Sequence, residues 1–163
     1  MNTTIPAVRP PNPPDGTGPA REPRWTRSDV LELGAYPSAV TSARLHCRAI
    51  LAEWDLACLG DDCETVLGEL MANSIEAHER EHLDAPVRLT LLGNRDAVLI
   101  VVRDASDRPP SPSHPGLDDE TGRGLLIVAA LSSHWDFKRM PGGGKVTRAL
   151  LEAGNGEAPG AGE

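Results

Sequence analysis

The stretch that decides the fold is residues 61–82, DDCETVLGELMANSIEAHEREH. Its apolar residues recur every three or four positions, which places them on one face of an α-helix: Val66, Leu67, Leu70 and Met71. Glu69 and Asn73 are four residues apart, so they lie one turn apart at the edge of this face. There a partly desolvated carboxylate can hold or move a proton, and a carboxamide oxygen can ligate Mg²⁺.

The segments on both sides of this helix alternate between strand and helix patterns. We expect a helix over residues 38–54, another over 125–131, and strands near 30–33, 86–92, 97–102, 134–139 and 145–151. The order strand-helix-helix-strand-strand-helix-strand-strand predicts an α/β fold. Its architecture should be a two-layer α/β sandwich, with the helices on one face of a mixed or antiparallel sheet.

The two ends of the chain differ in composition from its middle. Residues 1–24 are rich in proline and poor in large apolar residues, which predicts a disordered tail. Residues 153–163 are mostly Gly, Ala and Glu and are expected to be flexible. The expected organisation is therefore one folded domain, residues 25–152, between two tails.

The overall composition narrows the classes of function. A net charge of −8 argues against direct binding to nucleic acid or to an anionic membrane surface. No apolar run approaches the roughly 18 residues of a membrane span, and no signal peptide is visible. The three cysteines lack metal-ligand spacing and indicate reduced thiols. We therefore expect a cytoplasmic protein whose partners are proteins and small ligands.

Two further places could carry chemistry. Asp104 ends the most apolar strand, where a carboxylate can accept a hydrogen bond from an exocyclic amine. Gly122-Arg123-Gly124 precedes a helix, whose free N–H groups together with a guanidinium suit a phosphate. Residues 104–121 form a long polar loop between them, a length that usually indicates function or disorder.

Together the three motifs carry a resemblance. Residues 69–74 (ELMANS), 102–106 (VRDAS) and 122–128 (GRGLLIV) resemble the N, G1 and G2 boxes of GHKL (gyrase, Hsp90, histidine kinase, MutL) ATPases. The chain looks most like the single-domain anti-sigma factor and serine-protein kinase type, over residues 29 to 151. The resemblance implies a Bergerat-type ATP-binding fold and ATP with Mg²⁺ as cofactors. A sigma factor and an anti-anti-sigma (antagonist) protein would be its partners, with a possible homodimer.

The resemblance also implies roles for single residues. Asn73 would ligate the Mg²⁺ ion, and Glu69 would be the catalytic base for a protein serine hydroxyl or for water. Asp104 would recognise adenine, with Ser106 beside it in the nucleotide site. The phosphates would lie along the turn before the last helix: Gly122, Arg123, Gly124 and Leu125.

The chain departs from the family pattern at several positions. Ser106 and Arg108 replace the two glycines that the wider superfamily has in the G1 box, which favours the anti-sigma branch. In the last hairpin Val146 stands where the family often has threonine, and Thr147 falls on the opposite face of its strand. An acidic run, residues 118–120, precedes the expected phosphate site and would repel a nucleotide unless it points away.

Alternative interpretations remain open. Singly, the three motifs are compatible with a solvated helix face, a turn residue and an ordinary helix start. In function, the chain could be a nucleotide-binding interaction module without significant kinase activity. A histidine kinase catalytic domain would need a phosphoacceptor helix from another protein, and a gyrase-like ATPase would need a transducer domain.

Overall fold

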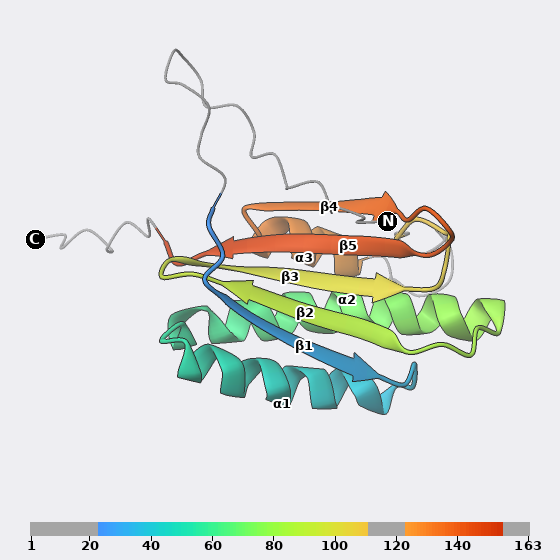
Figure 1. The fold of residues 1–163 in the computed structure, drawn as a ribbon, viewed down its shortest axis with the longest axis horizontal. Helices are drawn as coiled ribbons and strands as arrows, with labels where there is room; N and C mark the ends of the chain where they lie inside the picture. The colour runs from blue at the N-terminus through green and yellow to red at the C-terminus, as the bar shows by residue number, and fades with distance from the viewer. Residues whose placement is uncertain (1–22, 111–122, 155–163) are drawn as a thin grey trace, which may run out of the picture.

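The structure is a computed structural model that describes residues 23–110 and 123–154. In this part of the chain, five strands form one sheet in the order β1-β2-β3-β5-β4, and every neighbouring pair is antiparallel. The helices lie along one side of that sheet (Figure 1). The described residues therefore form an α/β sandwich of two layers.

The elements follow the order that the sequence pattern predicts, with shifts of a few residues at their ends. They are β1 (Arg27–Leu33), α1 (Ser38–Glu53), α2 (Gly60–Glu81), β2 (Val87–Gly93), β3 (Ala97–Asp104), α3 (Gly124–Leu131), β4 (His134–Arg139) and β5 (Lys145–Glu152). A short 3₁₀ helix, η1 (Ala57–Leu59), was not expected from the sequence. The predicted fold class is confirmed, and the sheet is antiparallel within the described residues.

The long helix α2 has recognisable start and stop signals. Asp61 and Asp62 lie in its first turn, where their negative charge favours the positive end of the helix dipole. It ends at His82, which adopts a left-handed backbone conformation with φ of 53°. The predicted helix over residues 61–82 is confirmed to within one residue at each end, so Glu69 and Asn73 do share one helix.

The main core lies between the helices and the sheet. Its largest contributions come from α1, α2, β2, β3 and β5, and its fully enclosed side chains include Leu51, Leu67, Met71, Leu91 and Ile100. Cys47 and Cys63 are free thiols inside this layer. Burial, and secondarily the charge of Glu64, raises the pKa of Cys47 to about 12, so its thiol stays protonated at neutral pH.

A second apolar cluster lies on the other face of the sheet. It consists of Ala97, Leu99, Val101, Val146 and Leu150. Val146 is opposite Arg103 in the β3–β5 pairing, whereas its neighbours Lys145 and Thr147 face the helices. The strand position where the family often has threonine therefore points away from the helices, and Lys145 faces Asp104 instead.

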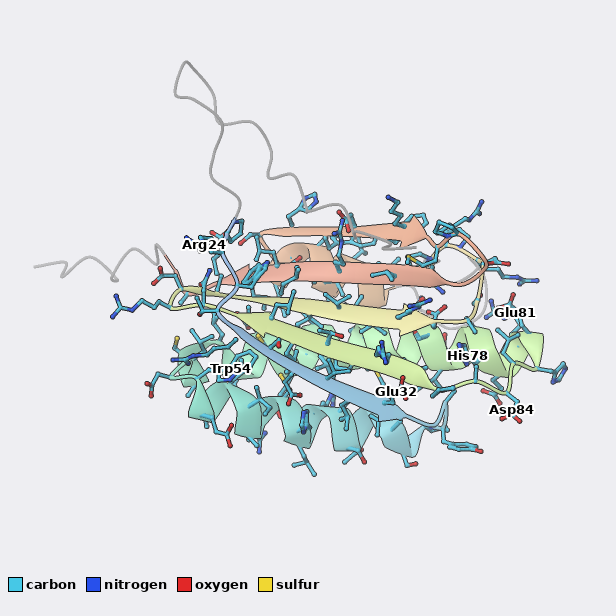
Figure 2. The ribbon with its side chains drawn as sticks, viewed as in Figure 1. Arg24, Glu32, Trp54, His78, Glu81 and Asp84 are labelled. Carbon is cyan, nitrogen blue, oxygen red and sulfur yellow. The ribbon has the colours of Figure 1, made fainter. Side chains whose placement is uncertain are left out.

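The two ends of the sandwich differ in character (Figure 2). At one end, Trp54 follows α1 and packs so closely on Gly93 that a Cβ there would lie 2.6 Å from the indole ring. At the other end, His78 and Glu81 lie near the end of α2. That polar end is the one that contains Asp104. No helix in the described residues is long and apolar enough to cross a membrane.

The predicted tails and the predicted long loop fall largely outside the described residues. This applies to residues 1–22, 155–163 and 111–122. The proposed domain boundaries at residues 25 and 152 therefore stay predictions.

Candidate nucleotide-binding site

Asp104 and Lys145 form a buried ion pair at one end of the sheet. The two residues are opposite each other in the β3–β5 register, so the backbone pairing brings their side chains together. The Lys145 ammonium nitrogen, Nζ, lies 3.0 Å from Oδ1 and 2.9 Å from Oδ2 of Asp104. Their side chains are 1% and 0% exposed, so this pair is shielded from solvent. Its charges are compensated within the protein.

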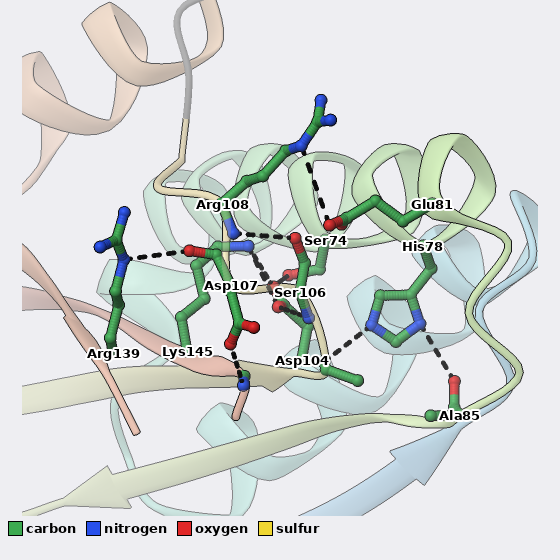
Figure 3. A network of polar contacts seen from close by, with 12 residues as sticks. Ser74, His78, Glu81, Ala85, Asp104, Ser106, Asp107, Arg108, Arg139 and Lys145 are labelled. Atoms are coloured by element: carbon green, nitrogen blue, oxygen red, sulfur yellow. Dashed lines mark hydrogen bonds and ion pairs between the residues drawn. The ribbon is translucent and has the colours of Figure 1, made fainter. Parts of the chain in front are cut away.

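The remaining acceptor positions of Asp104 are also used (Figure 3). The Ser74 hydroxyl donates to Oδ2 at 2.6 Å, and the Ser106 backbone N–H donates to Oδ1 at 2.9 Å. A carboxylate has about four acceptor sites, and four contacts from Ser74, Ser106 and Lys145 occupy them. In this conformation Asp104 has no free acceptor for the exocyclic amine of adenine.

His78 ties this end of the molecule together. Its Nε2 accepts a hydrogen bond from the Ala105 backbone N–H at 2.9 Å, and its Nδ1 lies 3.1 Å from the Ala85 carbonyl oxygen. A backbone N–H can only donate and a carbonyl can only accept, so these partners select the neutral ring with its proton on Nδ1. The ring joins α2 to the segment before β2 and to the loop after β3.

The loop after β3 is held against the turn between β4 and β5. The Asp107 carboxylate accepts a hydrogen bond from Gly144 N–H at 2.7 Å, and the Asp107 carbonyl accepts one from Arg139 Nε at 3.0 Å. Gly144 has φ of 84°, and a Cβ there would lie 2.4 Å from the Asp104 carbonyl oxygen. Only glycine allows both this conformation and this approach. These contacts fix the start of β5, whose first residue is Lys145.

Glu69 and Asn73 differ from this network. Both lie on α2 and are half-buried. Within residues 23–110 and 123–154, neither side chain makes a hydrogen bond or an ion pair. A Cβ on Gly124 would lie 2.6 Å from Oε2 of Glu69, so the backbone at the start of α3 adjoins this carboxylate. The glycine predicted for the phosphate turn thus leaves room for the predicted base.

The other predicted site residues are placed as follows. Arg123 is exposed at the residue before α3, and Leu125 is half-buried in its first turn. Ser106 is buried: its N–H bonds Asp104, and its hydroxyl accepts from the Arg108 backbone N–H at 3.2 Å. Gly122 lies outside the described residues, as does the acidic run 118–120.

The two parts of the candidate nucleotide site are therefore built differently. Glu69, Asn73 and the Gly124 backbone present polar groups without partners among the described residues, and their chemistry fits Mg²⁺ and phosphate oxygens. Within the described residues no group of three or more His, Cys, Asp and Glu side chains is placed to hold a metal ion. The base end does not fit adenine without rearrangement, because Asp104 is already saturated.

A comparison of the chain with models of protein families identifies its family. The model of the histidine kinase-like ATPase domain matches residues 33–150. The chain belongs to this family. Membership implies ATP binding and a kinase-like ATPase role, and it agrees with the antiparallel α/β sandwich seen here. None of the curated proteins matched the chain.

Sequence reasoning missed four residues of this site. The sequence analysis assigns no role to Lys145, His78 or Asp107, and Ser74 enters it only as the last residue of the 69–74 motif. Ser74 and His78 are four residues apart on α2, so helix spacing could have placed them on one face. Lys145 required the register between β3 and β5, which the sequence pattern leaves open.

Proposed function

We propose that the chain is an ATP- and Mg²⁺-dependent regulatory protein of the anti-sigma factor serine kinase type. It would phosphorylate a serine of an anti-anti-sigma protein and sequester a sigma factor. The observation that carries the proposal is a pair of α2 side chains, Glu69 and Asn73, that have no partner within residues 23–110 and 123–154 and lie beside the backbone of Gly124. The Glu69 and Asn73 side chains are available to a ligand, whereas the Asp104 carboxylate is already hydrogen-bonded by other residues of the fold.

The proposed chemistry assigns each group one role. The Asn73 carboxamide oxygen holds Mg²⁺, which would neutralise charge on the phosphates. The Glu69 carboxylate accepts the proton of the attacking serine hydroxyl. The serine oxygen forms a bond to the γ-phosphorus, the bond from that phosphorus to the β–γ bridging oxygen breaks, and ADP leaves. Gly124 keeps the backbone close to Glu69 without a side chain between them.

Calorimetry with and without Mg²⁺ tests the site. Asn73→Ala should lose the Mg²⁺-dependent part of ATP binding, because the oxygen that ligates the ion is gone. Glu69→Gln should still bind Mg-ATP, since it keeps nearly the same shape. Glu79→Gln, on an exposed position of the same helix, is the matched control and should bind as the wild type does. Equal Mg-ATP affinity in the wild type and Asn73→Ala would contradict the assignment of the metal ligand.

A transfer assay tests the kinase step. Wild-type chain, γ-labelled ATP and an anti-anti-sigma protein should give a phosphoserine, and Glu69→Gln should lower that rate by about a hundredfold or more. Loss of the label after serine-to-alanine substitution in the acceptor identifies the residue modified. A rate unaffected by Glu69→Gln would exclude Glu69 as the base.

Two observations favour a second candidate, a nucleotide-binding interaction module without significant kinase activity. The saturated carboxylate of Asp104 and the outward position of Val146 remove two contacts that the base of ATP would use. Such a module would bind Mg-ATP weakly and transfer no phosphate. Labelled-phosphate transfer to a serine-bearing partner excludes this candidate.

A further inference from the structure

Lys145 occupies the place on Asp104 that a purine amine would need. We propose that Lys145 is an affinity- and specificity-determining residue, which competes with the exocyclic amine of adenine for the Asp104 carboxylate. This inference rests on the proposed ATP-binding function, because it concerns the base end of the same site. It assigns to a lysine of β5 a role that none of the three sequence motifs includes.

The acceptor capacity of Asp104 is the first argument. Ser74 and Ser106 use one acceptor position on each carboxylate oxygen, and Lys145 contacts both oxygens. The Ser106 donor is a backbone N–H in the loop directly after β3, and the Ser74 hydroxyl sits on a short side chain of α2. The ammonium is the only one of the three donors that sits on a long flexible stem. An incoming amine would therefore displace Lys145 before it displaces the others.

The structure holds Lys145 in place, which is the second argument. Lys145 starts β5 directly opposite Asp104, and the turn before it is fixed by the hydrogen bond from Gly144 N–H to Asp107. The close approach of Gly144 to the Asp104 carbonyl leaves little freedom at this point. The backbone thus places the Lys145 ammonium at the Asp104 carboxylate. In the protein without nucleotide, the group that competes with adenine is already bound there.

The consequence is a base site with little preference for adenine. Displacing Lys145 breaks a buried ion pair, so the hydrogen bond that adenine gains is offset by one that the protein loses. The carbonyl at position 6 of hypoxanthine is an acceptor and cannot take the place of the adenine amine on Asp104, so inosine triphosphate leaves the ion pair intact. We therefore expect the wild type to bind ATP and inosine triphosphate with similar affinity.

The test compares these two nucleotides on three forms of the full chain. Lys145→Thr removes the ammonium and frees acceptor positions on Asp104. Its ATP affinity should rise about tenfold to a hundredfold, the range of one hydrogen bond to a charged group, while its affinity for inosine triphosphate stays unchanged. Lys138→Thr, at an exposed position of β4, is the matched control and should behave as the wild type for both.

Each outcome has a distinct meaning. If the wild type binds ATP and Lys145→Thr binds it no more tightly, the inference fails and the proposed function stands. If neither form binds ATP or inosine triphosphate, the proposed function fails and the inference with it. If Lys145→Thr does not fold, Lys145→Met fills the same volume without a donor and takes its place. A parallel rise for both nucleotides would show a general effect on the pocket and would overturn the competition.

Discussion

The two ends of the candidate site use polar side chains in opposite ways. Near the start of α3, Glu69 and Asn73 are half-buried and have no hydrogen-bond partner within the described residues. At the end of β3, Asp104 is fully enclosed and all its acceptor positions are filled. Groups of the first kind are available to a ligand, whereas groups of the second kind hold the fold. Substitutions of Glu69 or Asn73 should therefore change binding with little effect on stability, whereas substitution of Asp104 should lower the stability of the fold.

Asp104→Ala should have the largest effect on stability. The substitution leaves the Lys145 ammonium buried without a counter-charge and removes the acceptor of Ser74, so the free energy of unfolding should fall by about 3–5 kcal/mol. Urea unfolding followed by circular dichroism measures the change. Glu69→Ala, at the other end, is the control and should shift the free energy by less than about 0.5 kcal/mol.

Equal losses in the two variants would break the comparison. They would mean that Glu69, like Asp104, supports the fold. A large loss of unfolding free energy in Asp104→Ala alone would show that Asp104 stabilises the fold and that Glu69 does not.

Some of this contrast follows from the sequence and some does not. Periodicity places the helices and strands, because burial of one face imposes a repeat of 3.6 or 2 residues. It also places Glu69 and Asn73 together, since their spacing lies within one helix. It does not reveal that Asp104 meets Lys145, because these residues are 41 positions apart and their pairing depends on strand register.

The donors that surround Asp104 are the part of this contrast that the sequence pattern does not reveal. From its position after an apolar strand, the sequence predicts a carboxylate that can accept a hydrogen bond from an exocyclic amine, and this role stays a prediction. A residue type and a strand end cannot show how many donors converge on a carboxylate from other elements. Here they come from α2, from the loop after β3 and from β5. Such tertiary contacts cannot be predicted from the local sequence pattern around Asp104.

His78→Leu should have an intermediate effect. Leucine fills similar space but leaves the Ala105 N–H and the Ala85 carbonyl without their ring partner, which should cost about 2 kcal/mol. Hydrogen exchange measures the local result, because the Ala105 amide should lose protection more than amides in the middle of β3. Arg80→Leu, at an exposed position of α2, provides the control. Unchanged exchange at Ala105 would show that this hydrogen bond does not stabilise the loop.

Asp107→Ala should have the smallest effect and tests how Lys145 is held. Asp107 is exposed, so water can replace its carboxylate at the Gly144 N–H, and the loss should be about 1 kcal/mol or less. The Arg139 contact uses the Asp107 backbone carbonyl and survives the substitution. The Gly144 amide should nevertheless exchange faster with solvent, because its acceptor is no longer fixed.

The value of this small change lies in its link to the ion pair. Gly144 immediately precedes Lys145, so a looser turn should weaken the hold on the ammonium without removing it. Asp107→Ala should then bind ATP slightly more tightly than the wild type, in the same direction as Lys145→Thr but well short of it. Faster exchange at Gly144 without any gain in ATP affinity would show that the turn does not affect binding of the base. The ion pair with Asp104 would then hold Lys145 without help from the turn.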